Sequence, residues 1–198
     1  MDGKTKNQIA EIIKTHQKMV VQLQGSGLKT IAAAAEAITR AIKKGATVYI
    51  CGNGGSAADS QHIAAEMVNR FECNRRALPA VALSTDSSVM TSIANDFSYE
   101  SIFARQAEAL VKKGDVLWAI STSGSSANVM AAVKVARQKG ALVLAFTGKE
   151  NSSLERLADI CLCADGKSTA RSQEIHQLAY HIICKLVESR FEGSGKQI

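Results

Sequence analysis

Short apolar runs alternate with longer amphipathic segments along most of the chain. The apolar runs are short enough for strands, and their nearly continuous apolar character is typical of strands buried on both faces. They occupy residues 48–51, 78–84, 115–120, 141–147 and 159–164. A helical pattern follows each run, first from residue 57 and then at 89–113, 127–139, 152–158 and 170–190. Strands that alternate with helices predict a parallel sheet with helices on both faces.

The predicted fold class is therefore α/β, a flavodoxin-like or Rossmann-like three-layer sandwich built on a five-stranded parallel sheet. No proline- or glycine-rich linker interrupts the core, so residues 1–198 predict a single domain whose α/β core spans 46–192. Ligands of such sheets bind at the carboxyl ends of the strands. We therefore look for chemistry in the loops that follow the strands.

Two additional amphipathic helices are predicted ahead of the first strand, at residues 5–23 and 28–44. We expect Gly25-Ser26-Gly27 to end the first helix. The second helix is expected to end at lysines followed by Gly45. A doubly wound sheet does not require this N-terminal segment, residues 1–45. Its apolar faces could wrap the domain or pack against another subunit, and we favour the subunit.

A glycine-rich loop from Gly52 to Ser56 joins the first strand to a helix. Its glycines let the backbone approach a ligand, and the helix N–H groups face back into the loop, which is typical of a phosphate site. Gly52, Gly54 and Ala57 also satisfy the G-x-G-x-x-A form of a dinucleotide fingerprint. That interpretation needs an acidic residue about 20 residues further on. Asp86 comes about 30 residues after the loop, so we disfavour a nicotinamide enzyme.

Polar residues also follow later strands. The third strand leads into residues 121–126, STSGSS, at the start of a helix. Hydroxyls and backbone N–H groups there can surround phosphate oxygens without lysine or arginine. A serine-rich helix cap has the same composition, but the echo of the glycine loop favours phosphate. Asn95 and Asp96 interrupt the helical pattern at 89–113 and predict a turn near the edge of the sheet.

Two helices carry side chains suited to proton transfer. His62 and Glu66 lie one turn apart after the glycine loop, so they share a face. A solvated polar face explains that spacing equally well. Gln173 and His181 lie eight residues apart on the last helix, which places them on one broad side. These four residue types suit a metal site, although their spacing does not require one.

Composition and charge argue against nucleic acid and membranes as partners of this protein. The net charge is +6, but the basic residues are scattered and aromatics make up only 5%, so we expect no nucleic-acid surface. No apolar run approaches the ~20 residues of a membrane span. The N-terminus lacks a signal-peptide core, and we expect a cytoplasmic protein. Its five cysteines have no framework spacing, so we expect reduced thiols.

Several separated motifs together resemble the phosphoheptose isomerases of the sugar isomerase (SIS) domain superfamily. In chain order they are CGNGGSAADSQHIAAE, SIANDFSYESIFARQ, DVLWAISTSGSSANV, LAFTGKE and ARSQEIHQLAYHI, within a resemblance that runs from about residue 28 to 190. One departure is Ser172, where the family commonly has an apolar residue, and we expect it to weaken local helix packing.

The resemblance implies isomerisation of D-sedoheptulose 7-phosphate to D-glycero-D-manno-heptose 7-phosphate, an early step towards heptose for lipopolysaccharide and other glycans. It also implies a homotetramer with active sites at subunit interfaces, and one zinc ion per subunit. Glu66 matches the catalytic base and His181 its acid–base partner. Residues that match substrate contacts are Asn53, Gly54, Gly55, Ser56, Glu66, Asn95, Asp96 and Gln173, with Ser121, Thr122, Ser123 and Ser126 at the phosphate. The matching zinc ligands are His62, Glu66, Gln173 and His181.

Two non-catalytic functions compete with the isomerase. The stretch SQHIAAEMVNRFECNRRALPAVAL is also similar to an SIS-domain protein that binds the DnaA replication initiator. Such relatives lack the residues that match Glu66 and His181, both of which this chain has. A phosphosugar-sensing regulator is disfavoured because no DNA-binding module is attached. We therefore favour the isomerase.

Overall fold

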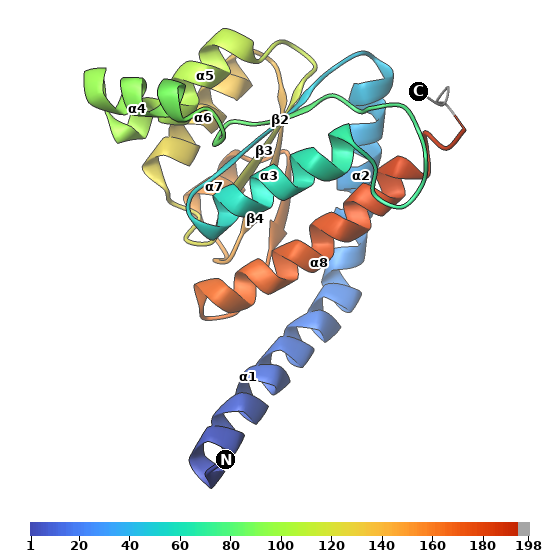
Figure 1. Cartoon of the computed structure of the whole chain (residues 1–198), viewed down its shortest axis with the longest axis vertical. Helices are drawn as coiled ribbons and strands as arrows, with labels where there is room; N and C mark the ends of the chain where they lie inside the picture. Colours follow the sequence, from blue (N-terminus) through green and yellow to red (C-terminus); the bar gives the residue numbers. More distant parts are fainter. Residues whose placement is uncertain (194–198) are drawn as a thin grey trace.

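A five-stranded parallel sheet forms the centre of the computed structural model, which describes residues 1–193 (Figure 1). The strand order is β2-β1-β3-β4-β5, and every neighbouring pair is parallel. The strands are β1 (Val48–Gly52), β2 (Ala80–Ala82), β3 (Val116–Ser121), β4 (Leu142–Thr147) and β5 (Ile160–Cys163). The predicted order of five strands along the chain is confirmed.

Helices cover both faces of the sheet, as the alternation of patterns predicted. On one face α2 (Leu28–Lys43), α3 (Gly55–Val68) and α8 (Thr169–Glu188) pack over alternate strand residues such as Trp118 and Phe146. On the other face lie α5 (Ile102–Leu110), α6 (Ala127–Gln138) and α7 (Ser153–Leu157). Each layer buries one side of β3, whose residues are all buried. The three-layer sandwich is confirmed.

The register of the sheet brings the two predicted loops together. Strand β1 lies between β2 and β3, and Gly52 at its end pairs with Ile120, one residue before β3 ends. The glycine loop and the serine loop therefore leave the same edge of the sheet from adjacent strands. Strands β1 and β3 are separated by more than 60 residues of sequence, so this adjacency is a property of the topology alone.

The predicted break at Gly25-Ser26-Gly27 is wrong. Helix α1 (Gly3–Gln22) continues through a π-helical turn, η1 (Leu23–Gly27), directly into α2. A π-helical turn holds one more residue than an α-helical turn. Gly27 packs against Leu23 within it, where an added Cβ would lie 2.5 Å from Leu23 Cδ1. The end of α2 is as predicted, with Gly45 at φ +83° after two basic residues in the last turn.

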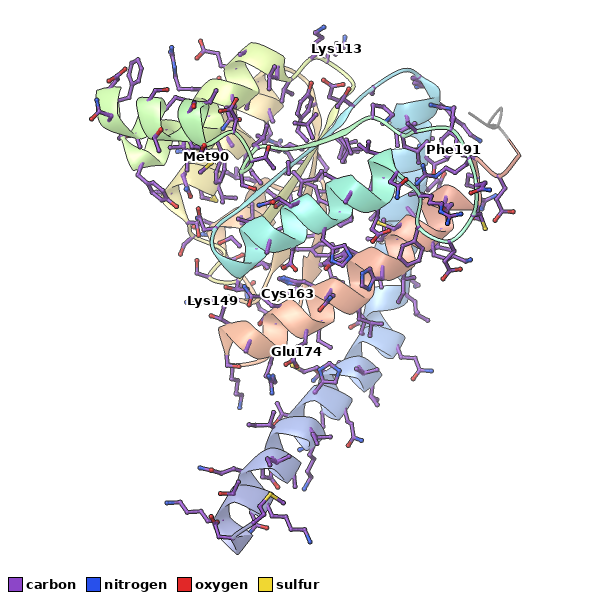
Figure 2. The ribbon with its side chains drawn as sticks, in the orientation of Figure 1. Met90, Lys113, Lys149, Cys163, Glu174 and Phe191 are labelled. Atoms are coloured by element: carbon purple, nitrogen blue, oxygen red, sulfur yellow. The ribbon has the colours of Figure 1, made fainter. Side chains whose placement is uncertain are left out.

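Helix α1 extends away from the sandwich, with the N-terminus at its tip (Figure 1). Ile9, Ile12, Ile13 and Val21 are 46–66% exposed. Near its C-terminal end α1 contacts α8, where His16 Nδ1 lies 2.8 Å from Glu174 Oε2. Glu174 lies on the side of α8 that faces α1 (Figure 2). Most of the apolar face of α1 thus has no neighbour within the described part of the chain.

Three local predictions can be compared with the structure. Strand β2 has only three residues, because it is an edge strand paired with β1 alone. The expected interruption is confirmed: α4 (Ser87–Asp96) ends at Asp96 and the short 3₁₀ turn η2 (Tyr99–Ser101) precedes α5. The expected weakness at Ser172 is not apparent, since this residue is buried and its hydroxyl donates to the Ala164 carbonyl at 2.7 Å.

No helix within residues 1–193 is both long enough and apolar enough to cross a membrane.

All five cysteines are free thiols in the structure, as expected. Cys51 and Cys184 are buried in the core, where burial raises the pKa of each thiol to about 12. These two thiols are packing residues.

Candidate functional site

The glycine loop makes a tight turn between β1 and α3. Gly54 has φ +55° and ψ −120°, a combination that L side chains rarely adopt, and the next residue begins the helix. An added Cβ at Gly55 would lie 2.5 Å from Nε2 of Gln173. The absence of a side chain at Gly55 therefore lets α8 bring the Gln173 amide against the N-terminus of α3. Ser56 is buried in the first turn of that helix.

Asn53 is held by residues that the sequence analysis missed. Its side chain makes a reciprocal amide pair with Asn128 of α6, with both N···O distances 2.8 Å. Its Oδ1 also accepts a hydrogen bond from the Tyr99 hydroxyl at 3.0 Å. Asn128 is buried and lies in the first turn of the helix after the serine loop. The amide pair thus fixes the two loops relative to each other.

Three hydroxyls of the serine loop converge at the N-terminus of α6. Ser121 Oγ lies 2.9 Å from Ser126 Oγ and 3.2 Å from Ser123 Oγ. Gly124 turns the loop with φ +63°, and its carbonyl accepts from Leu154 N at 2.9 Å. Hydroxyls beside the free N–H groups of a twelve-residue helix are the groups from which anion sites are built. The structure brings these three serines together, and their role in binding phosphate stays a prediction.

Thr122 contributes to this loop through its backbone, because its carbonyl accepts a hydrogen bond from Gly148 N at 3.0 Å. Asn95 and Asp96 lie at the end of α4, where Asn95 Nδ2 donates to Asp96 Oδ1 at 2.8 Å and both residues are exposed. The structure places Tyr99 three residues further on, and through it this segment reaches Asn53. Within residues 1–193, Asn95 and Asp96 themselves make no hydrogen bond to either loop.

His62, Glu66 and His181 form a single cluster, which we call the histidine–glutamate cluster. His62 Nε2 lies 3.0 Å from Glu66 Oε1 and 3.5 Å from His181 Nε2. The other ring nitrogen of His62 lies 3.0 Å from the hydroxyl of Tyr180. Helix α8 thus brings His181 to the pair His62 and Glu66, which were predicted on one face of α3. Tyr180, which contacts His62, was missed because its partner lies 118 residues away in the sequence.

The surroundings of His181 favour its neutral form. Burial lowers its pKa, and the adjacent His62 lowers it further, while Glu66 acts in the opposite direction. Burial likewise raises the pKa of the Tyr180 hydroxyl, with Asp59 adding to the shift. A neutral imidazole can accept a proton, and the Glu66 carboxylate, only 21% exposed, can do the same. The cluster therefore has the groups needed for acid–base chemistry.

The donor types in the cluster suit zinc, which binds imidazole nitrogen and carboxylate oxygen. Tetrahedral zinc with bonds of about 2.0–2.1 Å separates its ligand atoms by about 3.3 Å. The contacts of His62 Nε2, at 3.0 and 3.5 Å, bracket that value. Within residues 1–193, however, no three His, Cys, Asp or Glu side chains are arranged as a metal-binding group. Gln173, the fourth expected ligand, lies instead against Gly55.

Comparison with known proteins identifies relatives of this chain. The SIS domain family model matches residues 11–148. The phosphoheptose isomerase of Roseiflexus sp. (strain RS-1) is 49% identical over 158 residues, which are 80% of each protein. Among solved structures, the phosphoheptose isomerase GmhA from Neisseria gonorrhoeae is 38% identical with a TM-score of 0.84, over 94% of this chain and 97% of that chain. The phosphoheptose isomerase from Francisella tularensis is 31% identical with a TM-score of 0.90, over 93% and 98% respectively.

Proposed function

The chain belongs to the phosphoheptose isomerase family of SIS-domain proteins, and on that premise we propose that it converts D-sedoheptulose 7-phosphate into D-glycero-D-manno-heptose 7-phosphate. The observation that carries the proposal is the convergence of Glu66 and His181 from two helices, in a domain whose serine loop presents three hydroxyls at a helix N-terminus. A carboxylate and an imidazole supply proton transfer, and the serine loop holds the phosphate.

The reaction moves one proton between neighbouring carbons of the substrate. Glu66 removes a proton from C1 of the ketose, beside the C2 carbonyl, and the electron pair of the C–H bond forms the C1–C2 double bond of an enediol as the C2 oxygen gains a proton. Glu66 then returns its proton to C2 while the C1 oxygen loses its own, which leaves the aldehyde at C1. His181 takes the proton that the C1 oxygen loses and delivers a proton to the C2 oxygen, so its imidazole ends in the protonation state in which it began.

We also propose that zinc binds at this site. His62, Glu66 and His181 would hold it, with Gln173 as the expected fourth ligand by resemblance to the family. A bound zinc ion acts as a Lewis acid that stabilises negative charge on the substrate oxygens. Support comes from the donor types and from the spacing of the atoms around His62 Nε2.

The proposed assembly is a homotetramer with active sites at subunit interfaces. It is supported by the exposed isoleucines of α1, an apolar face that extends beyond the domain. We propose a cytoplasmic enzyme whose product enters heptose synthesis for lipopolysaccharide or another glycan. The competing functions, binding of the DnaA initiator or phosphosugar sensing, have no specific support in the site.

The test is direct conversion. Purified protein is incubated with D-sedoheptulose 7-phosphate, with and without added zinc, and the aldose is followed by NMR. We expect accumulation of the heptose 7-phosphate, faster with zinc. No conversion by folded protein under either condition would contradict the proposed activity and favour a non-catalytic function.

A further inference from the structure

The relative position of Glu66 and His181 depends on how the C-terminal ends of α3 and α8 are joined. Glu66 lies in the last turn of α3, where the final carbonyls of a helix have no partner within the helix. The chain then leaves the helix at Asn69 and passes through residues 70–79 to β2. Helix α8 ends at Glu188, about two turns beyond His181. The sheet supports both helices from one side, and the connection between their C-terminal ends lies beyond that packing.

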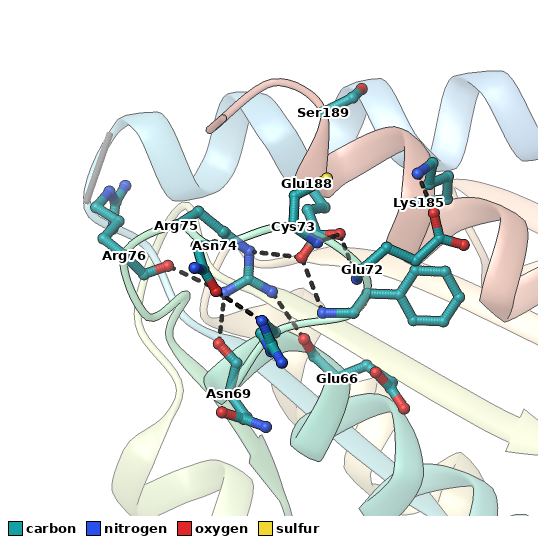
Figure 3. A network of polar contacts seen from close by, with 12 residues as sticks. Glu66, Asn69, Glu72, Cys73, Asn74, Arg75, Arg76, Lys185, Glu188 and Ser189 are labelled. Carbon is teal, nitrogen blue, oxygen red and sulfur yellow. Dashed lines mark hydrogen bonds and ion pairs between the residues drawn. The ribbon is translucent and has the colours of Figure 1, made fainter. Parts of the chain in front are cut away.

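Arg75 caps the end of α3 at the backbone of Glu66. Its Nη2 donates to the carbonyl of Glu66 at 2.7 Å, and its Nη1 donates to the carbonyl of Asn69 at 3.0 Å (Figure 3). A cation is favourable at a helix C-terminus, and here it satisfies carbonyls that the helix leaves unpaired. The Arg75 side chain is only 1% exposed, so the surrounding residues restrict the position of its guanidinium.

Glu188 holds both Arg75 and the connecting segment. Its Oε1 lies 3.4 Å from Arg75 Nε, and its side chain is also 1% exposed. The carboxylate accepts three backbone N–H groups, from Phe71 at 2.8 Å, Glu72 at 2.7 Å and Cys73 at 2.9 Å. Burial alone would raise the pKa of Glu188, but these N–H groups and Arg75 hold it below its ordinary value.

The same segment reaches the other half of the cluster. The N–H of Phe71 binds Glu188, and its ring lies against His181 with centroids 5.6 Å apart. The network thus touches Glu66 through a backbone carbonyl and His181 through an aromatic ring. Arg75, Glu188 and Phe71 lie outside the predicted site residues, and within residues 1–193 they make no hydrogen bond to the serine loop.

We propose that Arg75 and Glu188 are positioning residues, which set the distance and orientation between Glu66 and His181 without contacting substrate. This rests on the isomerase function proposed above. A misplacement of about 1 Å between reacting groups can cost about 100-fold in rate. Loss of the network therefore lowers kcat while substrate binding, which depends on the two loops, is retained.

The test compares Arg75→Lys, Arg75→Met and Glu188→Gln with the wild-type full chain. Calorimetric titration with inorganic phosphate counts the native binding sites per chain, and isomerase kinetics give kcat and KM. We expect one site per chain in each variant, KM within about threefold of wild type, and kcat reduced about 100-fold in Arg75→Met and less in Arg75→Lys, which keeps the charge.

The matched control is Lys185→Met, which removes the neighbouring exposed ion pair between Lys185 and Glu72. An exposed pair contributes little, so kcat should stay within twofold of wild type. The proposal is overturned if kcat stays near wild type in Arg75→Met and Glu188→Gln. The number of phosphate sites per chain reports the fraction of folded protein. If activity falls only in proportion to that fraction, the network serves folding alone and the proposal is also overturned. Absence of turnover in the wild type would instead reject the proposed function.

Discussion

A buried histidine makes the stability of the fold depend on pH. His176 of α8 is fully buried, and its Nε2 donates to the carbonyl of Thr147 at 3.1 Å. Its ring lies 5.2 Å from that of Phe146, and its Nδ1 has no hydrogen-bond partner within residues 1–193. Burial therefore lowers the pKa of His176 to about 4 from an ordinary 6.5.

The sign of the effect follows from proton uptake by the two states. Between pH 6.5 and 4 the unfolded chain protonates this histidine while the folded chain keeps it neutral, so stability falls as the pH drops through that window. One pKa unit corresponds to about 1.4 kcal/mol, and lowering the pH from 7 to 5 removes about 2 kcal/mol of unfolding free energy through this one group.

The assay is urea unfolding at pH 7 and pH 5 at one fixed protein concentration, for wild type and His176→Gln. Glutamine has an amide N–H that can reach the same carbonyl but does not titrate. We expect the variant to lose about 2 kcal/mol less than wild type between the two pH values. Equal losses in the two proteins would refute the reasoning that His176 is held neutral by burial.

Three further changes test the loops and the metal. Gly124→Ala places a Cβ 2.3 Å from Ser152 Cβ at φ +63°, so inorganic phosphate should bind about tenfold more weakly in calorimetry, and unchanged binding would contradict the role of the loop. Asn128→Ala removes both amide hydrogen bonds that orient Asn53. If they contribute roughly 1.5 kcal/mol of free energy to the transition state, kcat/KM should fall by about tenfold. Zinc should raise the Tm of wild type by binding the folded state, and His62→Gln should abolish that rise; an equal rise in the variant would place the metal elsewhere.

The order of strands and helices could be predicted because the periodicity of apolar residues is a local property. Strand β3 is buried at every position, and its sequence is correspondingly apolar throughout. The continuous helix through Gly25-Ser26-Gly27 could not be predicted, since glycine usually ends a helix. Here Leu23 and Gly27 are buried, and Leu162 of β5 lies 3.7 Å from the position of an added Cβ at Gly27, so the π turn packs against the sheet. This tertiary contact overrides local propensity.

In the candidate site, too, local features could be predicted from the sequence and long-range contacts could not. The two loops could be found because each follows an apolar strand and precedes a helix. The partners Asn128 and Tyr99 could not, because their contacts to Asn53 depend on the adjacency of β1 and β3. Arg75 and Glu188 are 113 residues apart in the sequence and meet only when α3 and α8 pack together. No local pattern identifies such a pair.

The central claim is that Glu66 carries the proton between two carbons of the substrate. The most direct measurement is isomerisation in D₂O by wild type and Glu66→Gln, with the product examined by NMR for deuterium at C2. We predict that wild type yields aldose carrying deuterium at C2 through exchange on the carboxylate. Glu66→Gln should bind inorganic phosphate normally and form almost no product. Near-normal turnover by Glu66→Gln would contradict the account.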